Sequence, residues 1–178
     1  VHVAVVTALC VMVLDLLSGV LLAVALSGLV AFARVALPHD AVLARVDDLD
    51  GWVDADQYAE GERLPGLLVF RFDAPLFFAN SARFRDRLEQ MLVHNPGDEH
   101  WVVLDFEGVG AVDATALDTL GTLVDDFRAR GIVLAVARAN ERALVPLRRA
   151  GLLDDGGLRI YATIRLAVRA FEAARPGA

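Results

Sequence analysis

The first 37 residues constrain the fold of this chain most strongly, because they contain almost no charge. Asp15 and Arg34 are the only formally charged residues between Val1 and Leu37, and the segment is dense in Val, Leu and Ala. An apolar run of this length is too long for a core helix and is typical of a membrane-embedded segment. A signal peptide is the competing interpretation, but it needs basic residues before an apolar stretch of roughly 7–15 residues. The sequence therefore predicts a terminal transmembrane segment over residues 1–37.

The apolar segment can be arranged in two ways. Because a full helical crossing needs about 20 residues, one complete span with the end of another fits, whereas two complete crossings do not. A hairpin of two short helices that meet within the sequence LDLLSG also fits. We expect this hairpin, because Asp15, Ser18 and Gly19 together interrupt the apolar pattern there.

The position of the arginines predicts the orientation of the chain. Arg34 and Arg45 follow the second expected helix, and basic residues next to a span favour the cytoplasmic side. The chain also begins at Val1 rather than at a methionine, so we expect a longer, multi-pass parent protein. The expected localisation is the cell membrane, with the lipid bilayer as partner of residues 1–37 and the rest of the chain in the cytoplasm.

The remaining residues, 38–178, are acidic and carry no recognisable catalytic motif. The net charge of −7 argues against nucleic acid as a partner, since phosphate binding needs a basic patch. No phosphate-binding loop, zinc-binding helix motif, paired cysteines or nucleophile elbow is found. We therefore predict no enzyme activity, no catalytic or metal-binding residue and no cofactor.

Strands and helices alternate along residues 38–178, which predicts an α/β layer structure with largely parallel strands. Residues 38–66 are interpreted mainly as a linker that includes a first strand near residues 41–46. The other strands are expected at residues 67–74, 100–106, 132–137 and 158–163. Helices are expected at residues 80–93, 116–127, 140–152 and 164–171, the third broken or bent near Pro146. The result is one compact domain with four or five strands and about four helices.

Two acids and a threonine form the candidate site, near the start of the second of these helices. Asp105 ends an expected strand, and Asp113 is the expected N-cap of the helix that follows. Both then lie at the carboxyl edge of the sheet, where open α/β folds place their sites. Thr115 falls in the first helical turn, where backbone N–H groups lack partners and negative charge is favoured. It is either a phosphate acceptor or a turn residue, and both acids also have an ordinary structural interpretation as a helix cap and an acceptor for loop amides.

Three stretches in this order resemble the C-terminal end of a SulP-type anion transporter, the sulfate permease family: RVALPHDAVLARV, PGLLVFRFDAPLFFAN and VVLDFEGVGAVDATALDTL. In that family the last membrane helices lead into a cytoplasmic STAS domain. The resemblance implies a STAS fold, a mixed sheet of four to five strands with helices to one side. It also implies a parent protein that moves an anion such as sulfate, bicarbonate or a dicarboxylate, with an upstream transporter core and a homodimeric assembly.

Related anti-sigma-factor antagonists carry a D-S-[ST]-G stretch that a partner kinase phosphorylates. The resemblance places the acceptor on Thr115 and the preceding acid on Asp113, with Ala114 in place of the first hydroxyl and Ala116 in place of the glycine. A regulatory protein or kinase is therefore an expected partner of this region. The leading hypothesis is a regulatory and assembly module of a membrane anion transporter. The alternative is a free-standing antagonist that acts by protein binding and phosphorylation, and the apolar segment disfavours it.

Overall fold

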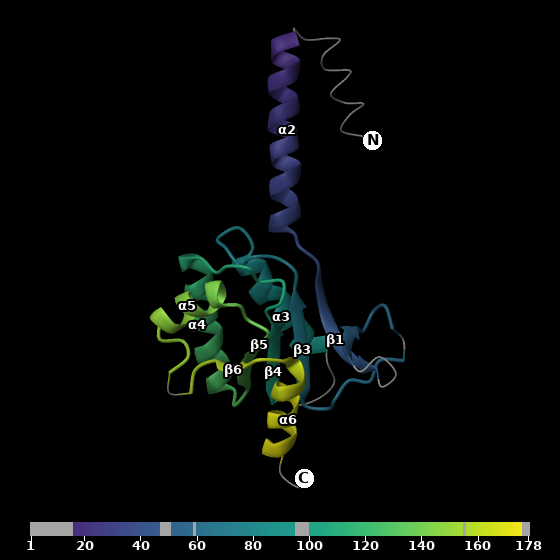
Figure 1. Ribbon diagram of the computed structural model, residues 1–178, viewed down its shortest axis with the longest axis vertical. Coiled ribbons are helices and arrows are strands. Elements are labelled where there is room, and N and C mark those ends of the chain that lie inside the picture. Colours follow the sequence, from purple (N-terminus) through teal and green to yellow (C-terminus); the bar gives the residue numbers. More distant parts are fainter. Residues whose placement is uncertain (1–15, 47–50, 59, 95–99, 155, 176–178) are drawn as a thin grey trace. The chain divides into compact units, whose positions relative to one another are not determined.

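The computed structural model describes residues 16–46, 51–58, 60–94, 100–154 and 156–175. Two compact units divide the chain, Val1–Pro38 and His39–Ala178. Figure 1 shows the helices and strands.

The first unit contains the apolar helix α2, which spans Leu16–Ala36. Its 21 residues extend over roughly 30 Å at 1.5 Å per residue, which matches the hydrocarbon core of a bilayer. The stretch Leu17–Ala36 has a mean hydropathy of 2.1, and only 6% of it is buried. By length and composition α2 could therefore cross a membrane.

The predicted hairpin is wrong, because α2 continues without a break through Ser18 and Gly19. Serine and glycine weaken a helix only slightly at single positions, and the Leu, Val and Ala residues around them favour the helix. One apolar helix is therefore observed where the hairpin's turn was expected. Asp15 and the expected first arm lie outside the described residues.

The second unit is built on a six-stranded mixed sheet of order β2-β1-β3-β4-β5-β6. β1 is antiparallel to both β2 and β3, whereas β3, β4, β5 and β6 run parallel to one another. The strands are β1 Asp40–Val46, β2 Gly51–Asp54, β3 Leu67–Phe72, β4 Trp101–Asp105, β5 Val133–Ala137 and β6 Arg159–Tyr161. The mixed and largely parallel sheet is confirmed, but its count of four to five strands is wrong. β2 was missed because its four residues lie in the polar, glycine-punctuated segment interpreted as a linker.

Four helices accompany the sheet, as expected: α3 Ser81–His94, α4 Ala114–Ala129, α5 Glu141–Arg149 and α6 Ile164–Ala174. Of the two alternatives expected near Pro146, a break or a bend, the break is wrong, because α5 continues for three residues beyond Pro146. Proline removes one backbone donor, and α5 tolerates this loss while Ala143, Leu144 and Leu147 remain buried against the core.

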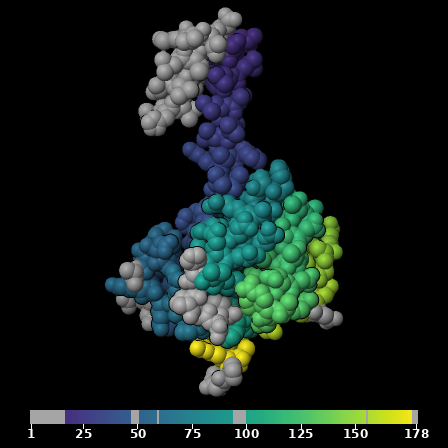
Figure 2. Space-filling view, turned by 180° about the vertical axis from the view of Figure 1, so that it is seen from behind, coloured from purple at the N-terminus to yellow at the C-terminus, as the bar shows by residue number. Residues whose placement is uncertain are grey.

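The helices cover both faces of the sheet, which corrects the expectation that they lie to one side. α3, α4 and α5 pack on the face that includes Phe70 and Leu104, whereas α6 packs on the face that includes Val69 and Val103. Successive side chains of a strand point to opposite faces, and every residue of β4 is buried, so the second face also needs a cover. Figure 2 shows the side formed by α3 and α4, which lie next to each other.

The carboxyl ends of β3, β4 and β5 lie at one edge of the sheet. Phe72, Asp105 and Ala137 are the last residues of these strands, and Asp105 lies beside Ala137 in the parallel ladder. β1 runs in the opposite direction, so its first residue, Asp40, lies opposite Phe72 at the same edge. The candidate site residues follow these strand ends in the chain.

Candidate functional site

Asp113 caps helix α4 and also holds a distant loop. Its Oδ1 accepts a hydrogen bond from the N–H of Ala116 at 2.9 Å, which confirms the predicted N-cap. Its Oδ2 accepts a second bond from the N–H of Phe78 at 2.9 Å. The backbone N–H of Asp113 donates to the carbonyl of Leu76. The first turn of α4 is therefore attached to the loop that follows β3.

Thr115 lies in the first turn of α4, and its side chain is exposed. Its carbonyl accepts the hydroxyl of Thr119 at 3.0 Å, as in an ordinary helix interior. In the part of the chain that the structure describes, no hydrogen bond to the Thr115 hydroxyl is recorded. The hydroxyl is therefore accessible and is not required by the packing of α4.

The loop after β3 presents an aromatic residue beside this turn. Phe78 is 65% exposed, whereas Asn80 is fully buried. The Asn80 side chain accepts the N–H of Phe77 at 3.0 Å and donates to the carbonyl of Pro75 at 2.8 Å. Asn80 thereby folds the loop tightly, so that Phe78 is held at the surface by buried polar contacts. We call the exposed residues around this point the Thr115 surface: Phe78, Gly110, Ala111, Ala114 and Thr115.

Asp105 lies in a different network at the same sheet edge. Its side chain is fully buried and forms a bidentate ion pair with Arg138, in which Nε lies 2.9 Å from Oδ1 and Nη2 contacts Oδ2. Arg138 Nη1 also lies 2.7 Å from the Glu107 carboxylate. Asp105 accepts the N–H of Glu107 at 3.2 Å, as its structural interpretation predicted. A buried carboxylate paired in this way joins the ends of β4 and β5.

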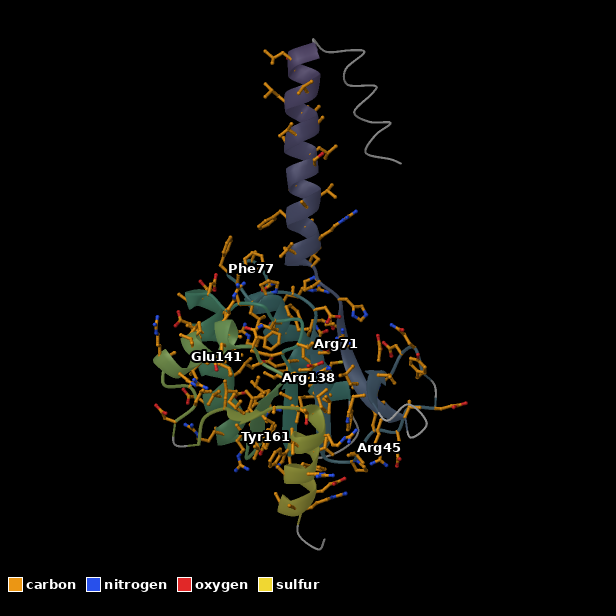
Figure 3. All side chains as sticks on the ribbon, viewed as in Figure 1. Arg45, Arg71, Phe77, Arg138, Glu141 and Tyr161 are labelled. Carbon is orange, nitrogen blue, oxygen red and sulfur yellow. The ribbon has the colours of Figure 1, made fainter. Side chains whose placement is uncertain are left out.

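The backbone of Arg138 adopts the left-handed conformation, with φ of 59°. Such a conformation is uncommon for a residue with a side chain and costs on the order of 1 kcal/mol. The Arg138 N–H donates to the carbonyl of Tyr161 at 3.2 Å, so the strained residue links β5 to β6. The Arg138 guanidinium contacts Asp105, the last residue of β4 (Figure 3).

A second arginine extends this charged row to β3. Arg71 Nε donates to Asp73 Oδ1 at 2.7 Å, and Arg71 lies beside Asp105 in the parallel ladder. The hydrogen bond to Asp73 raises the pKa of Arg71 above its ordinary value, with further attraction from Asp73, Asp105 and Glu107, while burial opposes the shift. Arg71 therefore remains charged throughout the physiological pH range. The row carries three acids and two arginines.

The structure brings Asp105 and Asp113 to one sheet edge but gives them different partners. Asp105 is buried and forms an ion pair with Arg138. Asp113 is half-buried, and its carboxylate accepts backbone N–H groups. Among the described residues there is no group of three His, Cys, Asp or Glu side chains that could hold a metal ion. The residues of the Thr115 surface are exposed, whereas Asp105 is buried in its ion pair with Arg138.

Sequence reasoning missed Phe78, Asn80 and Arg138 as parts of this region. The signal for the first two was the sequence PLFFAN, in which two aromatic residues stand between a proline and an asparagine directly after a strand. Asparagine in such a loop commonly bonds nearby backbone groups. Arg138 had no local signal, because its partners are 31 and 33 residues away in the chain.

The family model of the STAS domain matches residues 58–167 of this chain. A protein named "Probable sulfate transporter" from Mycobacterium tuberculosis is 45% identical over 169 residues, which cover 94% of this chain and 30% of that protein. Probable sulfate transporter 4.2 of Arabidopsis thaliana is 32% identical over 145 residues, which cover 76% of this chain and 21% of that protein. This chain thus spans less than a third of the length of these relatives.

A solved structure is similar over almost the whole chain. It is the murine Solute Carrier 26 family member A9 anion transporter in the inward-facing state, with a TM-score of 0.85 and 26% sequence identity. The similarity covers 97% of this chain and 28% of the transporter. These similarities connect the α/β unit and the helix before it with the C-terminal portion of membrane transporters.

Proposed function

Since the chain belongs to the STAS domain family and matches the C-terminal portion of SulP-type sulfate transporters, we propose that it is the C-terminal part of a membrane anion transporter. Residues 1–37 are the end of the membrane part, and residues 38–178 are the STAS domain. The observation that most strongly supports this proposal is α2, a largely exposed apolar helix of 21 residues that directly precedes the domain in the chain.

The orientation follows from the arginines. Arg34 lies in the last turn of α2 and Arg45 lies in β1, and basic residues next to a span favour the cytoplasmic side. The STAS domain is therefore cytoplasmic, and the parent protein is a multi-pass protein of the cell membrane. Sulfate is the first candidate for the transported anion, because the relatives are named for sulfate transport; bicarbonate and dicarboxylates are the other candidates.

The role of the STAS domain is regulation and assembly rather than chemistry. The Thr115 surface supports this role, because it combines an exposed aromatic ring with an accessible hydroxyl on a rigid helix start. Its partner is a regulatory protein, and phosphorylation of Thr115 by a kinase is the minor alternative. The upstream transporter core and a second copy of the chain are the expected assembly partners. A free-standing antagonist of anti-sigma factors would have no use for α2.

Membrane association tests the location directly. The full chain should float with liposomes, whereas a chain without residues 1–37 should remain folded and stay in the aqueous fraction. Leu26→Arg, near the middle of α2, should weaken flotation, since an arginine at the centre of a span costs about 2.5–3.5 kcal/mol. Leu166→Arg on α6, where Leu166 is an exposed apolar residue of the domain, is the matched control and should float as the wild type does. A full chain that stays in solution without detergent contradicts the proposal.

Sulfate uptake tests the activity. Cells that express the longer transporter should take up labelled sulfate, and removal of residues 38–178 should reduce or deregulate this uptake. Liposomes that contain only residues 1–178 should take up no more sulfate than empty liposomes, because a transport site needs convergent polar groups from several helices and the described residues contain a single candidate span. Uptake by this chain alone would contradict the assignment of transport to the upstream core.

A further inference from the structure

His39 lies between the carboxylates of Asp54, the last residue of β2, and Asp73, the residue after β3. Its Nδ1 is 3.3 Å from Asp73 Oδ2, at the end of β3, and its Nε2 is 3.5 Å from Asp54 Oδ2, the last residue of β2. His39 itself is the residue before β1, and the side chain is 58% exposed. One imidazole therefore faces acids on both neighbours of β1.

The two contacts require opposite nitrogens of the ring. A neutral imidazole carries a single N–H group, and the other nitrogen is an acceptor, which cannot bond to a carboxylate oxygen. Only the imidazolium can donate to Asp73 and Asp54 at the same time. The number of these contacts therefore depends on whether the ring carries one N–H group or two.

The charged groups around His39 carry one more negative charge than positive charge. Arg71 Nε donates to the other oxygen of Asp73 at 2.7 Å, and thus balances that acid. Among the described residues, Asp54 also accepts hydrogen bonds from the Gln57 side chain at 3.1 Å and from the N–H of Asp56 at 3.0 Å, both of which are neutral donors. Tyr58 lines the same shallow depression, whose volume is about 410 Å³. Among the residues that line this depression, two carboxylates and one guanidinium are charged, so protonation of His39 neutralises the cluster.

We propose that His39 is a proton-dependent clamp that joins β1 to β2 and to the end of β3. The protonated ring holds both acids, and loss of the proton releases one of them. Backbone bonds run beside the clamp, from Asp73 N–H to the His39 carbonyl at 3.1 Å and from Ala55 N–H to the Val42 carbonyl at 2.9 Å. The attachment of β2 is therefore firmer while the ring is protonated and looser once the ring is neutral.

Hydrogen exchange of the Ala55 amide in the full chain, held in detergent micelles, tests the clamp. Wild type and His39→Gln are compared at about pH 5.5 and about pH 8, on either side of the histidine range, after correction for the intrinsic exchange rate. At the lower pH, opening should be roughly two- to fivefold less frequent in the wild type than in the variant, the range expected of partly exposed ion pairs. At the higher pH the two proteins should agree.

Two further variants make the result specific. Asp54→Asn removes the partner on β2 and should reproduce the effect of His39→Gln. His100→Gln alters another exposed histidine and should leave the pH dependence unchanged. The proposal is overturned if the ratio of opening frequencies between the wild type and His39→Gln is the same at both pH values. It is also overturned if the wild type opens more easily than the variant at the lower pH.

A direct measurement covers the case in which His39→Gln does not fold. Nitrogen-15 shifts of the His39 ring in the wild-type chain should show two N–H groups at the lower pH, and Asp54→Asn should move the Nε2 signal more than the Nδ1 signal. Equal movement of both signals, or none, contradicts the clamp.

Discussion

The backbone N–H of Phe78 donates to the side chain of Asp113 across 2.9 Å, although 35 positions separate the two residues in the chain. The other oxygen of the same carboxylate caps α4. One side chain thereby fixes the loop that exposes Phe78 against the turn that exposes Thr115. The geometry of the Thr115 surface depends on Asp113.

Replacement of Asp113 should loosen this surface and destabilise the domain. Asp113→Ala removes the cap and the bond to Phe78, and we expect a loss of about 1–2 kcal/mol in the free energy of unfolding. Asp113→Asn retains one acceptor oxygen and should lose less. Thermal unfolding followed by tryptophan fluorescence measures this, because Trp52 and Trp101 both lie in the second unit. Equal stability of the alanine variant and the wild type would show that water replaces both bonds without cost.

Thr115 should matter for regulation and hardly for stability. Thr115→Ala removes an exposed hydroxyl and should change the free energy of unfolding by less than about 0.5 kcal/mol. Thr115→Glu adds negative charge at a helix start, where it is tolerated, although Asp113 and Asp118 are nearby acids. We expect an intact circular dichroism spectrum together with altered sulfate uptake or partner binding by the full-length transporter. Wild-type uptake by the glutamate variant would argue against a regulatory role, and a large stability loss in the alanine variant would show that the hydroxyl is structural.

Removal of Arg138 should be strongly destabilising, because it leaves the buried Asp105 carboxylate without its partner. We expect Arg138→Met to lose about 3–5 kcal/mol in the free energy of unfolding. The double variant with Asp105→Asn should recover part of this loss, since the buried charge is then absent. Arg148→Ala is the control, because its pair with Glu141 is exposed and 3.8 Å long, and it should change stability by less than about 1 kcal/mol. If Arg138→Met were as stable as Arg148→Ala, this would show that water solvates the Asp105 carboxylate once Arg138 is removed.

Two glycines in one loop provide a matched comparison. A Cβ atom at Gly108 would lie 2.9 Å from the Asp73 Cα, whereas one at Gly110 would meet nothing within 4 Å. Gly108→Ala should therefore destabilise the domain by about 1–3 kcal/mol, as overpacking does. Gly110→Ala should stay within about 0.5 kcal/mol of the wild type. Thermal unfolding of both variants decides the matter, and equal melting temperatures would mean that the loop moves away from Asp73 easily.

The elements with strong local patterns could be predicted from the sequence. The period of Leu120, Val124 and Phe127 indicated α4, and Asp113 was identified as its cap because helix starts favour a short acidic side chain. The alternation of strands and helices indicated the parallel part of the sheet. The continuous apolar run at residues 132–137 also indicated that β5 is a strand covered on both faces.

What could not be predicted depends on contacts between distant residues. β2 has only four residues and is recognisable as a strand through its pairing with β1. The ion pair between Arg138 and Asp105 joins two loops that no local pattern connects. The turn expected around Ser18 and Gly19 is absent because single serine and glycine residues cost a helix only about 1 kcal/mol or less. The break expected at Pro146 is absent although proline costs more, because α5 buries Ala143, Leu144 and Leu147 against the core.

The place of β1 in the sheet has a mechanical consequence. β1 follows α2 in the chain and lies between β2 and β3, with hydrogen bonds to both. These bonds run perpendicular to the strands, so tension applied along β1 from its first residue loads them in shear. They must then break together rather than one after another, as they would if an edge strand were peeled away. The domain is thus tethered through a strand that resists pulling.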